Sequence, residues 1–242
     1  MSPRTEAPRL SQCALTHRGH VRNINEDSIL SRPELGLWAV SDGMGGHAAG
    51  DFASRTVTAA LEALPADADP ANIPAAARAA LNRAHAEIRA EGDRLGQITI
   101  GATVVLLVIA EGYFMCLWVG DSRLYRIRDG GIEMISADHS VVGELVQQGY
   151  LDWDEAENHP HANQITRAVG VGETLEIDKR RGEVLPGDRF LLCSDGLTRY
   201  ARAETLRRML DGATLDSAGA GLMQIALDGG GADNISLIVV EA

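Results

Sequence analysis

ITIGATVVLLVIAEGYFMCLWVGDSRLYRIR, residues 98–128, is the most strand-like stretch of this 242-residue chain. It contains three apolar runs rich in β-branched residues, interrupted by Gly112 and by Gly120-Asp121: 98–109, 112–119 and 123–128. Apolar runs of this length between glycine-containing turns are typical of neighbouring strands. We therefore predict a meander of antiparallel strands, which residues 131–135 extend.

Helical spacing of apolar residues recurs on both sides of this stretch. We predict helices over residues 47–64, 73–88, about 140–148, 203–210 and 214–227, and strands over 189–194 and 235–240. Because strands and helices come in blocks rather than in alternation, an α+β fold with helices packed against antiparallel sheets is favoured. We expect a polar lead-in at residues 1–12 and a single domain over 13–242. At about 138–172 an insertion is long enough to be a functional loop.

The composition restricts the classes of partner. Apolar residues make up 45% of the chain and the formal net charge is −12, so the positive surface that nucleic acids and anionic membranes require is missing. The longest apolar run, Val104 to Ala110, is far shorter than the ~20 residues of a membrane helix. We expect no nucleic acid partner and no membrane insertion. A polar N-terminus and three scattered cysteines point to a cytoplasmic protein with free thiols.

An aspartate beside a glycine recurs where apolar strands are predicted to end. The pattern stands at Ser41-Asp42-Gly43, Gly120-Asp121 and Ser194-Asp195-Gly196, and a variant, Ala232-Asp233-Asn234, precedes the last strand. Carboxylates that converge on one rim of a sheet repel unless a cation lies between them. Oxygen ligands alone suit Mg²⁺ or Mn²⁺ better than Zn²⁺. The alternative is that each Asp-Gly pair is an ordinary turn.

A second element is the segment Arg22-Asn23-Ile24-Asn25-Glu26-Asp27. In an extended chain Arg22 and Glu26 point to one side and Asp27 to the other. A planar guanidinium beside a cation site can hold a phosphate through two parallel hydrogen bonds. The alternative is an exposed Arg–Glu pair of little energetic value.

Taken together, these segments resemble the PPM (type 2C) serine/threonine protein phosphatases in their compact stand-alone bacterial form. The resemblance spans about residues 13–240 and follows the order of the family's motifs. The matching segments are Arg22-Asn23-Ile24-Asn25-Glu26-Asp27, Asp42-Gly43-Met44-Gly45-Gly46-His47, Gly101-Ala102-Thr103, Val119-Gly120-Asp121-Ser122-Arg123, Asp138-His139-Ser140, Ile165-Thr166-Arg167-Ala168-Val169-Gly170, Ser194-Asp195-Gly196-Leu197 and Asp233-Asn234-Ile235-Ser236.

The resemblance implies two packed antiparallel β-sheets flanked by helices on both sides (α-β-β-α), with a flap at about 138–172. It also implies two Mn²⁺ or Mg²⁺ ions at one edge of the sandwich. Asp42 would bridge the two ions, and Asp195 and Asp233 would hold the first. Glu26 or Asp27, with the Gly43 carbonyl, would serve the second, and Asp121 with Asp195 would form a weaker third site.

The activity implied is hydrolysis of phosphoserine and phosphothreonine by attack of a metal-bridging hydroxide, with Arg22 stabilising the phosphoryl oxygens. Met44 stands where eukaryotic relatives have a histidine, so His47, one helical turn later, is a candidate general acid. A metal-bound water is the alternative acid. The implied substrates are phosphorylated proteins, and the implied partner is a Hanks-type Ser/Thr kinase with its targets, in some family members within type VI secretion.

Three other interpretations remain open. Cys193 and Arg199 have the Cys-x₅-Arg spacing of cysteine-dependent phosphatases, although Leu192 replaces the usual preceding histidine and an acid lies inside the loop. A thiolate nucleophile there would form a phosphocysteine. The chain could instead be a non-enzymatic module that binds metal or phosphopeptide, or it could act on a small-molecule phosphate.

Overall fold

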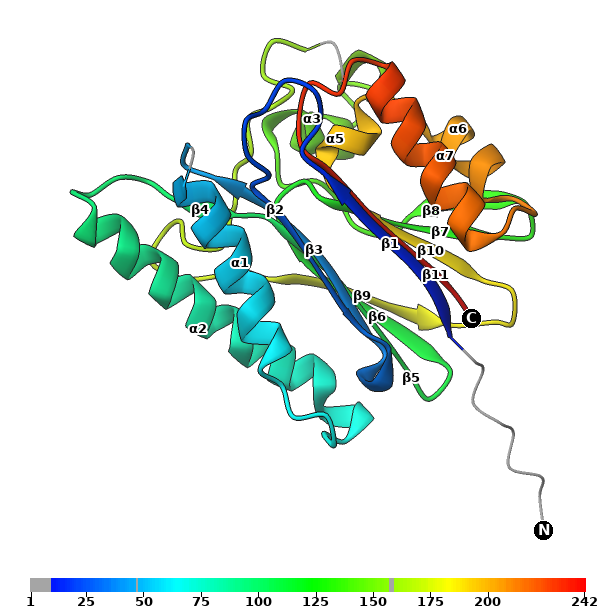
Figure 1. The fold of residues 1–242 in the computed structure, drawn as a ribbon, viewed down its shortest axis with the longest axis horizontal. Helices are drawn as coiled ribbons and strands as arrows, with labels where there is room; N and C mark the ends of the chain where they lie inside the picture. The colour runs from blue at the N-terminus through cyan, green and yellow to red at the C-terminus, as the bar shows by residue number, and fades with distance from the viewer. Residues whose placement is uncertain (1–9, 47, 157–158) are drawn as a thin grey trace.

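The computed structural model describes residues 10–46, 48–156 and 159–242. Two antiparallel sheets pack face to face, and helices cover the outer face of each (Figure 1). The strands of the first sheet, in spatial order, are β2 (Asp27–Arg32), β3 (Leu37–Met44), β5 (Val104–Ala110), β6 (Tyr113–Val119) and β9 (Asp178–Glu183), with β4 (Gly101–Ala102) paired to β3. Those of the second are β1 (Ser11–His17), β11 (Ile235–Glu241), β10 (Arg189–Cys193), β7 (Arg123–Arg128) and β8 (Gly131–Met134).

Helices α1 (Ala48–Glu62) and α2 (Ile73–Arg94) cover the first sheet, and α6 (Ala203–Leu210) and α7 (Leu215–Asp228) cover the second (Figure 1). Three shorter helices, α3 (Val141–Gln147), α4 (Trp153–Ala156) and α5 (Asp195–Thr198), lie in the connections. The expected layers, helices outside two packed antiparallel sheets, are confirmed. Among the described residues, no helix has the length and apolar character needed to cross a membrane.

Both faces of the central strands are buried, which explains why their sequences show no polar alternation. In β5, Leu106 packs toward α1 and α2, whereas its neighbours Val105 and Leu107 pack between the sheets. The layer between the sheets also contains Trp38 and the tilted ring pair Phe114–Phe190, whose centroids are 5.3 Å apart. Side chains from α6 and α7 close a third apolar layer on the outer face of the second sheet.

The predicted meander over residues 98–128 is wrong at its last connection. β5 and β6 pair with each other, but β7 pairs with β10 and β8 in the other sheet. The chain changes sheets at Gly120, whose φ is +101° and where a Cβ would lie 2.6 Å from Thr103 Cγ2. Only glycine fits this turn without strain. The place of β7 beside β6 is taken by β9, a polar edge strand that apolar patterning did not predict.

The strand ends bring distant segments to one rim of the sandwich. Asp27 at the start of β2 is paired with Asp42 near the end of β3. Asp195 directly follows β10 and its preceding Ser194, and Asp233 stands just before β11, the neighbour of β10. Asp121 follows β6 at the crossing between the sheets. The fold thus collects acidic residues from both sheets at the same edge.

The layer between the sheets should dominate stability. We expect Phe190→Ala to lower the free energy of unfolding by about 3–5 kcal/mol, because Phe190 is fully buried and its removal leaves a cavity. Urea denaturation followed by circular dichroism measures this change. Tyr150→Ala, at a side chain that is 72% exposed, is the control and should change it by less than about 0.5 kcal/mol. A loss below 1 kcal/mol for Phe190→Ala would contradict this account of the core.

Candidate active site

Five aspartates converge at the rim where the two sheets meet, and we call them the carboxylate cluster: Asp27, Asp42, Asp121, Asp195 and Asp233. Burial raises the pKa of Asp42 well above its ordinary value, and the charges of the other four members raise it further. The pKa of Asp121 is also raised, first by burial and then by Asp195. The predicted convergence of carboxylates on one rim is therefore present in the structure.

Asp27 is the most buried member of the cluster. Its Oδ2 accepts a hydrogen bond from Ser194 Oγ at 2.8 Å, which ties β2 in one sheet to the end of β10 in the other. Its Oδ1 is buried and has no hydrogen-bond partner among the described residues. Burial raises the pKa of Asp27 to about 7, and repulsion by Asp195 and Asp233 adds to the shift. Such an oxygen is unfavourable unless it finds a donor or a cation.

Arg22 lies on the open side of the cluster and pairs with Asp233. Its Nε donates to Asp233 Oδ1 at 2.8 Å and its Nη2 to Oδ2 at 2.9 Å. The Arg22 side chain is 50% exposed, so solvent screens this pair and its contribution to stability is small. Arg22, which we predicted from the sequence to bind a phosphate, thus binds the Asp233 carboxylate in this structure.

Asn234 holds the Arg22 loop against the cluster. Its Nδ2 donates to the carbonyl oxygens of Arg18 and Ile24, each at 2.9 Å, and its Oδ1 accepts from the Glu26 amide at 2.8 Å. One side chain therefore fixes both flanks of Arg22 next to Asp233. Removing it would leave three backbone groups of this loop without their side-chain partner.

Glu26 and Gly43 lie side by side near the end of β3. The Gly43 amide donates to the Glu26 carbonyl at 3.1 Å. A Cβ at Gly43 would lie 2.0 Å from the Gly50 carbonyl oxygen, and one at Gly50 would lie 2.3 Å from Glu26 Oε1. These close approaches require glycine at both positions and leave the Glu26 carboxylate beside the end of β3 and the first turn of α1.

Hydroxyl groups beneath the cluster fix the backbone of Asp42. Thr103 Oγ1 accepts from the Asp42 amide at 3.0 Å and bonds Ser122 Oγ at 2.7 Å, while Ser41 Oγ donates to the Thr103 carbonyl at 2.6 Å. Sequence reasoning assigned the chemistry of the Ser-Asp-Gly motifs to their aspartates alone. The serine repeated in front of Asp42 and Asp195 was the signal for these supports.

The donor set of the cluster fits hard divalent cations. It consists of carboxylate oxygens with the Gly43 carbonyl nearby, and it lacks the nitrogen and sulfur ligands that Zn²⁺ prefers. Among the described residues, no three His, Cys, Asp or Glu side chains already form a metal cage. One reason that no cage is formed is the pairing of Asp233 with Arg22, which directs the Asp233 carboxylate toward the guanidinium. We expect Asp233 to change partner when cations bind.

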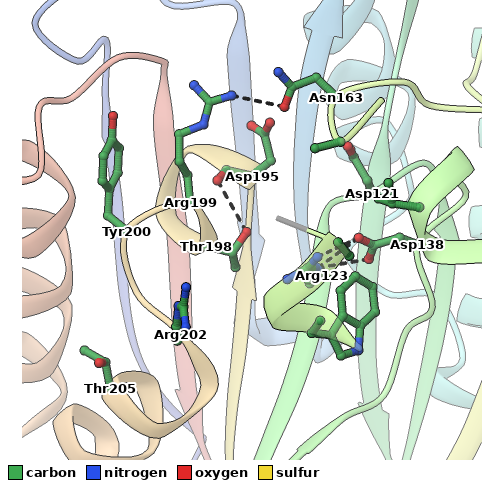
Figure 2. Close-up of a pocket in the computed structure, with 14 residues that line it drawn as sticks. Asp121, Arg123, Asp138, Asn163, Asp195, Thr198, Arg199, Tyr200, Arg202 and Thr205 are labelled. Atoms are coloured by element: carbon green, nitrogen blue, oxygen red, sulfur yellow. Dashed lines mark hydrogen bonds and ion pairs between the residues drawn. The ribbon is translucent and has the colours of Figure 1, made fainter. Parts of the chain in front are cut away.

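A cleft of about 450 Å³ opens beside the cluster (Figure 2). Asp121 and Asp195 line one part of it, and the flap contributes Trp153 and Asn163. Arg123 pairs with Asp138 through three contacts of 2.7–3.1 Å, and its guanidinium lies 4.4 Å from the centroid of the Trp153 ring. The flap is thereby attached to β7 directly beside the acidic residues.

The cysteine alternative does not fit the structure. Cys193 is fully buried, and burial raises the pKa of its thiol to about 12, so a thiolate does not form near neutral pH. Arg199 bonds Asn163 rather than closing a phosphate loop around the cysteine. The candidate general acid His47 lies outside the described residues, and its role stays a prediction.

The raised pKa of Asp27 predicts how stability depends on pH without metal. Because its folded-state pKa of about 7 lies above the ordinary 3.8, the neutral carboxyl stabilises the fold. This contribution is complete below about pH 4 and is lost as the pH rises through about 7, with an upper limit on the order of 4 kcal/mol. In EDTA we expect Asp27→Asn to gain Tm relative to wild type as the pH rises from 5 to 8.

Differential scanning fluorimetry across that range measures the effect. Asp67→Asn, at an exposed position in the loop between α1 and α2, is the control and should track wild type. With excess Mn²⁺ at pH 7.5, wild type should have a higher Tm than Asp27→Asn, because a cation stabilises the ionised wild-type cluster. A Tm difference that does not change with pH would contradict the prediction.

Comparison with known proteins agrees with this geometry. The model of the family "Protein phosphatase 2C" matches residues 16–228. The serine/threonine protein phosphatase PstP of Mycobacterium tuberculosis is 37% identical over 237 residues, which cover 96% of this chain and 45% of that protein. The chain thus spans about half the length of this curated relative.

Solved structures show the same architecture. PppA, a key regulatory component of T6SS in Pseudomonas aeruginosa, is 42% identical with a TM-score of 0.89, covering 97% of this chain and 98% of that one. The catalytic domain of PstP in complex with two manganese ions is 35% identical with a TM-score of 0.86, covering 96% and 97%. The expected fold is confirmed, and the two ions of that relative match the expected pair of cations. The chain belongs to the protein phosphatase 2C family.

Proposed function

We propose that this chain is a metal-dependent phosphatase that removes phosphate from phosphoserine and phosphothreonine residues of proteins. The observation that carries this proposal is the carboxylate cluster with Arg22 on its open side. A pair of cations held by acidic residues, with an arginine facing them, is the arrangement that hydrolysis of a phosphate ester requires. Membership of the protein phosphatase 2C family supports the same reaction.

The individual residues are proposed to act as follows. Asp42, at the centre of the cluster, would contact both cations, and Asp195 and Asp233 would complete the first position. The Gly43 carbonyl, with Glu26 or Asp27, would serve the second position, directly or through water. Asp121 would share a third and weaker position with Asp195. The proximity of the five aspartates, each of which affects the pKa of another member, supports the part of this assignment that concerns them.

When bound, the cations supply water activation and positive charge at the phosphoryl group. Arg22 then has two tasks that follow from its geometry. It leaves Asp233, whose oxygens it now contacts, and it donates the same two parallel hydrogen bonds to phosphoryl oxygens, whose charge grows in the transition state. Asn234 keeps the loop of Arg22 in reach throughout. We propose His47 as the proton donor to the leaving oxygen.

The physiological substrates are proposed to be a Ser/Thr kinase and the proteins that it phosphorylates, in the cytoplasm. The similarity to PppA, a regulatory component of T6SS, supports a role in type VI secretion.

Phosphate release from a phosphothreonine peptide tests the proposed function. With Mn²⁺ we expect activity in wild type and in Cys193→Ser, and a loss of at least about 100-fold in Asp42→Asn, because that variant removes the central charge of the cluster. EDTA should abolish the wild-type activity. Activity that persists in EDTA and disappears in Cys193→Ser would contradict the proposal and would identify the Cys193 thiol as the nucleophile.

Substitution of Arg22 tests its role separately. We expect Arg22→Gln to lower kcat/KM for the phosphopeptide about 100-fold and Arg22→Lys to recover part of it, because lysine keeps the charge but not the two parallel donors. Calorimetry should show that Arg22→Gln binds Mn²⁺ at least as tightly as wild type, since Asp233 loses its competitor. Arg83→Gln, on the exposed side of α2, is the control. A change of less than threefold in kcat/KM for Arg22→Gln would show that Arg22 does not take part in the reaction.

A further inference from the structure

The cleft beside the carboxylate cluster contains side chains that the proposed reaction does not use. Figure 2 shows Arg199, Tyr200 and Arg202, which follow α5, on one side, and Arg123, Asp138 and Asp121 on the other. A second hollow of about 340 Å³ continues from it along Trp153 and Arg202 to Ile132 and Met134. The two hollows share walls and form one groove that leads away from the catalytic rim.

Arg199 is held at the end of this groove that is nearest to the reaction. It is exposed, and its Nη2 donates to Oδ1 of Asn163 in the flap at 3.1 Å. Arg199 and Asp195 line the same cleft, which places the guanidinium beside the carboxylate cluster. A guanidinium has five N–H donors, and the bond to Asn163 uses one of them.

Arg123 also faces the groove, but its guanidinium is already occupied. It is 14% exposed, it forms a bidentate pair with Asp138, and it packs over the ring of Trp153. Arg199 has no carboxylate within ion-pair distance among the residues that the structure describes. Its charge is therefore available to a ligand in a way that the charge of Arg123 is not.

We propose that Arg199, oriented by Asn163, binds an anionic side chain that flanks the phosphoresidue of the protein substrate. The anion is the carboxylate of an aspartate or glutamate, or a second phosphoryl group. The rest of the flanking segment lies along the groove toward Ile132 and Met134. This inference rests on the proposed phosphatase function and names the substrate class of the same site.

The overall charge of the chain makes such a contact selective rather than general. At a net charge of −12 the protein repels acidic peptides at a distance. That repulsion is screened beyond ~8 Å at physiological salt, whereas an arginine in direct contact with an anion is screened much less. We therefore expect a preference of about 3- to 10-fold in kcat/KM for an acid-flanked peptide over a neutral one.

Three phosphothreonine peptides test the proposal with the Mn²⁺-loaded enzyme. One has alanine and glutamine on both sides of the phosphothreonine, one has aspartate and glutamate there, and one carries a non-hydrolysable phosphonate analogue of phosphoserine. The measured quantity is the ratio of kcat/KM for each acidic peptide to kcat/KM for the neutral one. Using a ratio removes any change in the chemical step that a variant causes.

In wild type the ratio should exceed three, and in Arg199→Gln it should fall to about one, mainly through KM. Arg199→Lys should keep part of the preference, because a charge remains, and Asn163→Ala should lower it. Arg83→Gln removes an equal charge on α2, far from the groove, and should keep the wild-type ratio. A higher ratio for the phosphonate peptide would identify a second phosphate as the preferred anion, and a higher ratio for the carboxylate peptide would identify an acidic residue.

Two results would overturn the inference: a wild-type ratio near one for both acidic peptides, or an unchanged ratio in Arg199→Gln. Neither result contradicts the proposed function, which in this experiment fails if the wild-type enzyme releases no phosphate from any of the three peptides. The thermal stability of each variant, measured in parallel, shows whether a lost preference comes from a disturbed fold.

Discussion

Repulsion among the buried aspartates at the rim of the sandwich is the constraint on which the rest of the structure depends. Burial and the neighbouring charges raise the pKa of Asp42, Asp121 and Asp195, and among the ion pairs of the described residues only Asp233 of this cluster is paired with an arginine. Bringing such groups together is unfavourable without compensating positive charge. Divalent cations would supply that charge, and the proposed phosphatase reaction uses the same arrangement that is unfavourable in the metal-free protein.

The two-sheet architecture meets this constraint by dividing the cluster between both sheets. Asp27 and Asp42 belong to paired strands of one sheet, while Asp195 and Asp233 flank neighbouring strands of the other. Small polar groups connect the halves: Ser194 bonds Asp27, and Asn234 holds the loop before β2. The groove and the flap extend the site away from the rim. Arg199 and Asn163 form a hydrogen bond at the end of the groove that is nearest to the rim.

Much of this could be predicted from the sequence, because the Asp-Gly motifs after apolar strands are local signals with a local cause. What could not be predicted depends on contacts between distant segments. β5 and β6 are apolar on both faces, so their pattern does not show which strand lies next to them, and the turn at Gly120 alone sends β7 to the other sheet. β9 is polar because it is an exposed edge strand. The bonds of Asp27 to Ser194 and of Arg199 to Asn163 join residues 167 and 36 positions apart.

A crystal structure of the protein grown with Mn²⁺, with anomalous diffraction measured at the manganese edge, tests the central claim most directly. The account predicts two strong anomalous peaks within the carboxylate cluster, both in contact with Asp42, and Asp233 turned from Arg22 toward one of them. It would be contradicted by manganese outside the cluster, by a single ion that Asp42 does not contact, or by a cluster that stays empty while Asp233 keeps its pair with Arg22.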